Sequence, residues 1–346
     1  MKDTIIKKTR KDYTVALKNY LALVKGNPAI EAIYQIGGIN NPGISDIDLI
    51  IVIKENAGKK DVEKLSIKCL KRKDQYVFLH EPVIINNNIL EKINNFLPLY
   101  KCKYIYGKRK EIPKQNKKQK LFHLIDMILL YYPRNILSIY VNKNINTRDA
   151  LCLLFLLGYN LAVCSEITKK NSKKYLDFKK KTILLRKKWF SLEKLKYIKL
   201  DNLIEQGHNL CYDMIEDMAG YLGNEQCKDS VFFSQEHSII FQKNWQKEKA
   251  KKQAILYYKK TKITASFLPC VYRRFLNRQI CGNIDKNYKK KKECIEMQIK
   301  LYERYGSICK TIGCTIPLSV RVKKTRDMIK IQAKKALHIL YKNGLL

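Results

Sequence analysis

The chain has 346 residues, a length that predicts about two compact units, each able to bury its own core. Hydrophobic residues make up 46% and charged residues 29%, a composition that excludes an intrinsically disordered chain. Lys and Arg number 69 against 31 Asp and Glu, for a net charge of +38, which is compatible with an anionic partner.

In the first 112 residues, predicted strands alternate with predicted helices. Apolar periodicity indicates a helix over 3–25, and an apolar run indicates a strand over Ile30–Ile36 that ends at Gly37 and Gly38. A turn-rich loop then leads to a strand over Asp46–Ile53. The remaining expected elements are a helix over 59–71, a strand over 75–85, a helix over 89–96 and a strand over 104–106. This order predicts an α/β (α+β) domain with a short mixed sheet at residues 1–112.

The character of the sequence changes after residue 112. Residues 108–120 form a charged segment with a proline, which is typical of a linker, and no strand alternation follows it. Helical periodicity instead predicts a large all-α domain over residues 113–346, with a weaker break near 220–237. Its expected helices cover 121–141, 147–167, 192–222, 242–258, 290–305 and 324–341.

The cysteines and the apolar segments predict the compartment. Eleven cysteines are scattered without a CxxC pair, which argues against a zinc site and favours free thiols. Residues 1–25 carry charges throughout, unlike a signal peptide. The most apolar stretch, Leu151–Cys164, contains Asn160 and is shorter than the roughly 20 residues that span a bilayer. We therefore expect a soluble, cytoplasmic protein without a membrane partner.

The main candidate functional residues are two carboxylates at the start of the second predicted strand. Asp46 and Asp48 are two residues apart, and because side chains alternate along a strand, both lie on the same face. Mg²⁺ prefers hard oxygen ligands and commonly combines one or two carboxylates with phosphate oxygens. The pair therefore predicts a site for Mg²⁺ or Mn²⁺. Upstream, Gly37 and Gly38 allow a triphosphate to approach the backbone closely, and Ser45 adds a hydroxyl donor.

This run resembles the signature of the nucleotidyltransferase superfamily, which has the polymerase-β-like fold. The signature is a Gly-Gly pair after a hydrophobic strand, then a loop, then Asp-hydrophobic-Asp-hydrophobic. Here these residues are Gly37, Gly38 and Asp46–Leu49, with Ser45 directly before the first aspartate. The resemblance covers about 18 residues, and the order of elements through residue 112 supports it.

The resemblance implies a third carboxylate on a neighbouring strand, as a metal ligand or a general base. Glu81 is the expected residue, because its distance from Asp48 leaves room for a helix and a returning strand. Pro82 follows it directly and can break the regularity of that strand, so that His80 becomes the alternative inward group. Asp74 is a more remote alternative.

The activity implied by the resemblance is metal-dependent transfer of a nucleoside monophosphate from a nucleoside triphosphate to an acceptor hydroxyl. The acceptor is left open among RNA, a small molecule and a protein. The charge favours RNA only weakly, because the basic residues are 57 Lys and 12 Arg, and Arg is the better fork for phosphate. The alternative is a non-catalytic nucleotide- or RNA-binding protein that keeps the fold with an incomplete set of carboxylates.

Overall fold

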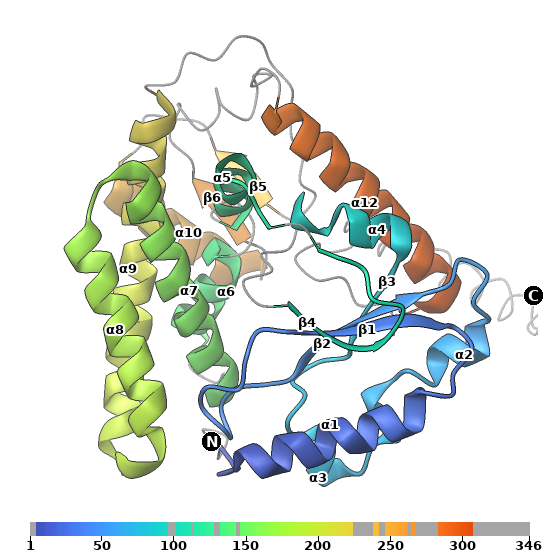
Figure 1. Cartoon of the computed structure of the whole chain (residues 1–346). Helices are drawn as coiled ribbons and strands as arrows, with labels where there is room; N and C mark the ends of the chain where they lie inside the picture. The colour runs from blue at the N-terminus through green and yellow to red at the C-terminus, as the bar shows by residue number, and fades with distance from the viewer. Residues whose placement is uncertain are drawn as a thin grey trace, which may run out of the picture.

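The protein has a mixed α/β architecture, with one four-stranded mixed sheet and many helices (Figure 1). The computed structural model describes residues 5–95, 102–112, 114–127, 132–142, 146–223, 238–241, 246–261, 264–267 and 283–306. The helix expected over 324–341 and most of the expected break near 220–237 lie outside these residues.

The strand order of the sheet is β3-β2-β1-β4. β1 (Ile30–Ile36) pairs antiparallel with β2 (Asp48–Ile53) and with β4 (Cys102–Gly107), while β2 pairs parallel with β3 (Val83–Asn86). Ile36 lies opposite Asp48, so the end of β1 and the start of β2 share one edge of the sheet. Since β3 runs parallel to β2, the segment that precedes β3 reaches the same edge.

Both faces of the sheet are covered, which explains why β2 is aliphatic throughout after Asp48. Leu49 and Ile51 belong to the core cluster between the sheet and α1 (Arg10–Val24), while Ile50 and Val52 belong to the cluster on the other face. That second cluster includes residues of α4 (Asn87–Glu91) and Cys294 of α12 (Asn283–Tyr305). Figure 1 shows α1 below the sheet and α4 and α12 above it.

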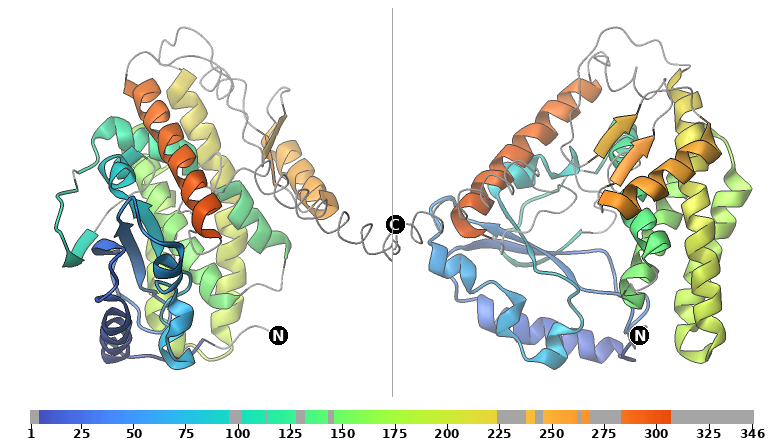
Figure 2. Two further views of the ribbon diagram at one scale, coloured as in Figure 1. Left: turned by 90° about the vertical axis from the view of Figure 1, so that its right-hand side faces the viewer. Right: turned by 180° about the vertical axis from the view of Figure 1, so that it is seen from behind.

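Helices of the middle of the chain form a second core. They are α5 (Lys117–Asp126), α6 (Tyr132–Val141), α7 (Thr147–Thr168), α8 (Ser172–Lys188), α9 (Leu195–Gly223) and α10 (Lys247–Thr261). α7 packs against α8, α9 and α6, and its residues Leu154, Leu157 and Leu161 are fully buried in this core. Both views in Figure 2 show α8 and α9 running alongside each other.

α7 is also long and apolar enough to cross a membrane, judged by length and composition alone. Half of its most apolar 18-residue window is buried within the protein, and no residue between 147 and 165 is fully exposed. In this structure α7 therefore serves as a core helix of the helical part. Asn146 caps its N-terminus, because its side chain accepts from the backbone N–H groups of Arg148 and Asp149.

Several expected elements are shorter or of another kind. The helix expected over 59–71 is α2 (Lys59–Glu63) followed by the 3₁₀ helix η1 (Ile67–Cys69). The strand expected over 75–85 is wrong for its first half, where α3 (Arg72–Gln75) precedes an irregular segment and only β3 forms. Pro82 has no N–H to donate, so the ladder with β2 begins one residue later, at Val83.

The region after residue 112 is not all-α, which corrects the expectation for this part of the chain. β5 (Ser238–Phe241) and β6 (Thr264–Phe267) form a separate two-stranded parallel sheet. Strands of four residues give too few alternations to be recognised among long helical periodicities. The same region also supplies α12, which lies over the sheet of the N-terminal part (Figure 2): its Cys294 is buried in a core cluster of that sheet, and the helix also contacts α5.

Candidate functional site

The glycine pair lies at the end of β1, with open space beside it. Gly37 adopts a φ of +72°, a conformation that other residues rarely take. Gly38 does not, and a Cβ built on it would come no closer than 4.0 Å to another atom, Oδ1 of Asn40. Neither backbone strain nor crowding therefore requires glycine at position 38. The absent side chain leaves the backbone accessible to a ligand.

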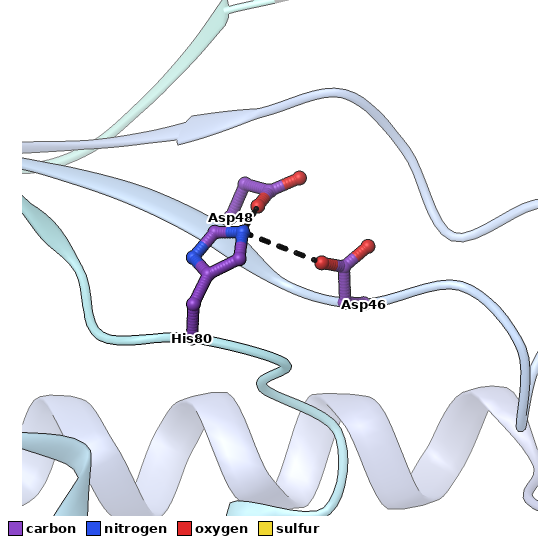
Figure 3. A group of neighbouring side chains, drawn as sticks. All are labelled: Asp46, Asp48 and His80. Atoms are coloured by element: carbon purple, nitrogen blue, oxygen red, sulfur yellow. Dashed lines mark ion pairs between the residues drawn. The ribbon is translucent and has the colours of Figure 1, made fainter. Parts of the chain in front are cut away.

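Asp46, Asp48 and His80 meet at the edge where β2 starts (Figure 3). His80 Nε2 lies 2.9 Å from Asp48 Oδ1 and 3.7 Å from Asp46 Oδ2. One ligand atom from each of the three residues lies within 4.8 Å of the other two. Asp46 directly precedes the buried Ile47 and Asp48 begins β2, so alternation along the chain turns both carboxylates to one side, as expected.

The three groups perturb one another electrostatically. Burial and the nearby Asp48 raise the pKa of Asp46 from 3.8 to about 6, because both disfavour its charged form. The hydrogen bond to Asp48 raises the pKa of His80 from 6.5 to about 9, against the opposing effect of burial. The two carboxylates thus favour a cation beside them, and in this structure the protonated imidazole of His80 is that cation.

Glu81 does not complete the site, which corrects the expected role of this residue. Its carboxylate accepts from the hydroxyl of Ser66 at 2.8 Å and from the backbone N–H of Ile67 at 2.9 Å, and the side chain is buried. A regular strand would place Glu81 level with Asp48, given that Val83 pairs with Ile50. The segment before β3 is irregular, so His80 reaches the aspartates instead. Asp74 is also committed elsewhere, to Asn19 at 2.9 Å.

The buried side chain of Ser45 makes a hydrogen bond within the loop between β1 and β2. Its side chain is buried, and Oγ accepts from the backbone N–H of Asn41 at 3.1 Å and from Nη2 of Arg186 at 3.2 Å. The structure therefore uses this hydroxyl within the protein, rather than as the expected contact to a nucleotide. Its effect on the site is indirect, because it fixes the residue directly before Asp46.

The residues at this edge fit a divalent cation. Two carboxylates and one imidazole are ordinary ligands of divalent metals, and all three lie within the span of one coordination sphere. Side-chain exposures of 18% for Asp46, 33% for Asp48 and 44% for His80 leave the group accessible from one side. These three side chains would hold the metal, and the glycine pair lies at the same edge of the sheet.

Two residues of the helical part contact the candidate site and are not predicted from the sequence. Arg148 of α7 and Arg186 of α8 reach the loop that carries Ser45 and Asp46. Their one signal in the sequence is that they are single arginines in a chain in which Lys is far more common. That signal does not say which loop they contact, because the contacts span more than a hundred residues of sequence.

Comparison with known proteins yields no match to a family model, to a curated protein or to a solved structure. The geometry of the site and the resemblance of its sequence motif are therefore the grounds for assigning a function.

Proposed function

We propose that the protein is a metal-dependent nucleotidyltransferase whose N-terminal part has the fold of the nucleotidyltransferase superfamily. The observation that carries the proposal is the position of Asp46 and Asp48, side by side at the sheet edge where β1 ends in Gly37 and Gly38. The mixed sheet, with β1 antiparallel to β2 and β3 parallel to it, also supports the proposal, as does the open space beside Gly38.

In the proposed reaction, an acceptor hydroxyl attacks the α-phosphate of a nucleoside triphosphate and pyrophosphate leaves. Asp46, Asp48 and His80 would hold Mg²⁺ or Mn²⁺. When bound, the ion supplies charge neutralisation for the triphosphate and for the transition state. The backbone at Gly37 and Gly38 receives the phosphates, since no side chain stands in the way.

His80 takes the place that the family gives to a third carboxylate. Its Nε2 faces both aspartates, so the neutral imidazole can act as a ligand there or accept the proton of the acceptor hydroxyl. The raised pKa of His80 means that this role requires loss of a proton, which a cation bound between the aspartates would favour.

A non-catalytic nucleotide- or RNA-binding protein is the second candidate. One observation favours it: Glu81, the carboxylate expected to complete the site, and Asp74, the more remote alternative, both make hydrogen bonds elsewhere. Within the residues described, the metal group contains two carboxylates and a histidine, but no third acid. The two candidates differ in one result, because a binding protein retains the nucleotide unchanged and a transferase releases pyrophosphate.

The proposal is tested by incubating the protein with each labelled nucleoside triphosphate, Mg²⁺ or Mn²⁺, and fractionated cell lysate that includes total RNA. We expect label in one acceptor fraction and pyrophosphate release. Asp46→Asn and Asp48→Asn should abolish both and leave the far-UV circular dichroism unchanged, since each removes a ligand rather than a core side chain. Asp177→Asn, at an exposed position on α8, is the matched control and should retain transfer.

The outcomes separate the candidates. Transfer retained in either aspartate variant rejects the site, and nucleotide binding without transfer in the wild type favours the binding protein. If RNA is the acceptor, its affinity should fall steeply with ionic strength, because Lys and Arg side chains release counterions when they neutralise phosphates. Affinity for a small acceptor should change much less with salt.

A further inference from the structure

Arg148 connects the helical part to both segments that carry the proposed metal ligands. The guanidinium donates through Nε to the carbonyl of Ile44 at 3.0 Å and through Nη2 to the carbonyl of Ser45 at 2.6 Å. Its third nitrogen, Nη1, donates to the carbonyl of Tyr76. Ser45 directly precedes Asp46, and Tyr76 lies on the segment that leads to His80. One side chain of α7 thus fixes the backbone on both sides of the site.

Arg186 of α8 acts on the same loop from a second direction. Its Nη2 donates to the hydroxyl of Ser45 at 3.2 Å, and its guanidinium carbon lies 4.0 Å from the centre of the Phe155 ring. Arg148 and Arg186 are 4% and 5% exposed, so both cations are removed from water. Neither makes an ion pair with a carboxylate among the described residues.

Burying two cations that have no ion pair between two layers of a protein is energetically unfavourable. A buried charge costs several kcal/mol unless it is paired or well hydrogen-bonded, and apolar side chains would join the layers at lower cost. Both arginines direct their donors at the loop directly before Asp46: Arg148 at the carbonyls of Ile44 and Ser45, and Arg186 at the hydroxyl of Ser45.

We infer that Arg148 and Arg186 are positioning residues for the proposed metal site, an inference that rests on the proposed function. They hold Ser45 and the Tyr76 segment from behind, so that Asp46 and His80 face the same point. Neither arginine touches the metal or the nucleotide. The helical part is thereby a component of the site rather than only a support for an acceptor.

The inference is tested by measuring Mn²⁺ affinity by electron paramagnetic resonance, together with melting temperature. Arg148→Lys keeps the charge but loses the planar fork that reaches three carbonyls. We expect it to weaken Mn²⁺ binding about 10- to 100-fold, as is typical when a partner behind metal ligands is removed. Arg304→Lys is the matched control. Arg304 also donates to a backbone carbonyl of the N-terminal part, that of Glu55 at 2.8 Å, but it is exposed and contacts neither segment of the site.

A merely structural role would lower the melting temperature without changing the Mn²⁺ affinity of the folded protein. Wild-type affinity in folded Arg148→Lys therefore overturns the inference. If Arg148→Lys does not fold, Arg186→Lys serves as the second variant. It removes one hydrogen bond to Ser45 and should weaken Mn²⁺ binding about threefold, as expected from one hydrogen bond. Unchanged affinity in that variant counts equally against the inference.

The same measurement distinguishes failure of the inference from failure of the proposed function. Wild-type protein that binds no Mn²⁺, or Asp46→Asn protein that binds it as tightly as the wild type, rejects the metal site itself. Binding that depends on Asp46 but not on Arg148 or Arg186 leaves the metal site in place and rejects only their positioning role.

Discussion

His80 occupies the third position of the candidate site, between two aspartates that are both partly accessible. An imidazole nitrogen suits transition metals better than Mg²⁺, which prefers oxygen. We therefore expect the wild type to prefer Mn²⁺ over Mg²⁺, and His80→Asp to shift the ratio of the two affinities toward Mg²⁺ by about tenfold or more. Competition of Mg²⁺ against the Mn²⁺ resonance measures this ratio. His80→Asn, which offers a weaker ligand of similar size, is the control.

The same histidine predicts how stability depends on pH in the metal-free protein. The pKa of His80 is raised from 6.5 to about 9 by its hydrogen bond to Asp48, so the folded state binds this proton more tightly than the unfolded state. This contribution to the free energy of unfolding is complete below pH 6.5 and is lost as the pH rises through about 9. The pKa of Asp46, raised to about 6, acts in the same direction over the lower window that starts near 3.8.

Urea denaturation at a series of pH values, in the presence of a chelator, measures both windows. His80→Asn should remove the fall in stability between pH 6.5 and 9 and keep the fall at lower pH. A wild-type stability that rises over the upper window would show that His80 is not held by the aspartates in solution.

At the scale of single residues, the sequence predicts the position of a side chain where that position follows from regular secondary structure. Asp46 and Asp48 could be placed on one face, because the two-residue alternation of a strand extends to its first residues. The choice between His80 and Glu81 could not be made in the same way, since it depends on an irregular segment before β3. Arg148 and Arg186 could not be assigned to the site at all, because their partners, backbone carbonyls for Arg148 and the hydroxyl of Ser45 for Arg186, are more than seventy residues away.

Among the elements, two glycines with opposite surroundings allow a matched prediction. A side chain at Gly38 enters open space, so Gly38→Val should fold normally and lose affinity for a nucleoside triphosphate. Gly207 lies in α9 where it faces α7 and α8, and a Cβ there would lie 3.1 Å from Leu154 and 3.2 Å from Phe178. Overpacking typically costs about 1–3 kcal/mol, which exceeds the roughly 1 kcal/mol that Ala gains over Gly inside a helix, so Gly207→Ala should destabilise the protein by up to about 2 kcal/mol and leave nucleotide binding unchanged.

Calorimetric melting and binding of a fluorescent nucleotide measure the two effects on the same samples. Gly26→Ala, at a position with no atom within 4 Å of the added Cβ and no proposed function, is the control for both. If Gly38→Val binds nucleotide as the wild type does, the phosphates do not lie at the end of β1.

The prediction of an element is confirmed where one apolar pattern continues along the sequence, and it is wrong or missing where that pattern is interrupted. β1 forms over the expected residues, and α9 nearly does, because each presents one uninterrupted pattern. α8 is not among the expected helices. Its buried residues Tyr175, Phe178, Thr182 and Leu185 lie at helical spacing, but a dense series of lysines separates them in the sequence.

For the molecule as a whole, the boundary expected at residue 112 does not separate two independent cores, because a later helix is buried against the N-terminal sheet. α12 lies far beyond it in sequence, yet Cys294 is buried in the cluster on one face of the N-terminal sheet. Lys92 and Glu293 form an ion pair at 2.8 Å across the same contact. Later parts of the chain thus contact both the loop that carries Ser45 and the sheet. Arg148 and Arg186 contact the loop, and α12 packs on the sheet.

The end of α12 supplies the sharpest test of this shared core. The hydroxyl of Tyr305 donates to the carbonyl of Ala57 at 2.8 Å, and the side chain is 3% exposed. Tyr305→Phe leaves that buried carbonyl without its partner and should lower the free energy of unfolding by about 1–2 kcal/mol. Tyr106→Phe is the matched control, because its hydroxyl donates to the carbonyl of Lys25 at 2.7 Å in an exposed position, where water replaces it.

Urea denaturation followed by circular dichroism measures both variants. If α12 packs on the sheet in solution, the loss in Tyr305→Phe exceeds that in Tyr106→Phe, and a single unfolding transition is retained, because the sheet and α12 unfold together. Equal effects of the two substitutions would place Tyr305 in water and remove α12 from the core of the N-terminal part. The sheet edge that carries Asp46 and Asp48 would then depend on the helical part through the contacts to its loop, which include those of Arg148, Arg186 and Cys152.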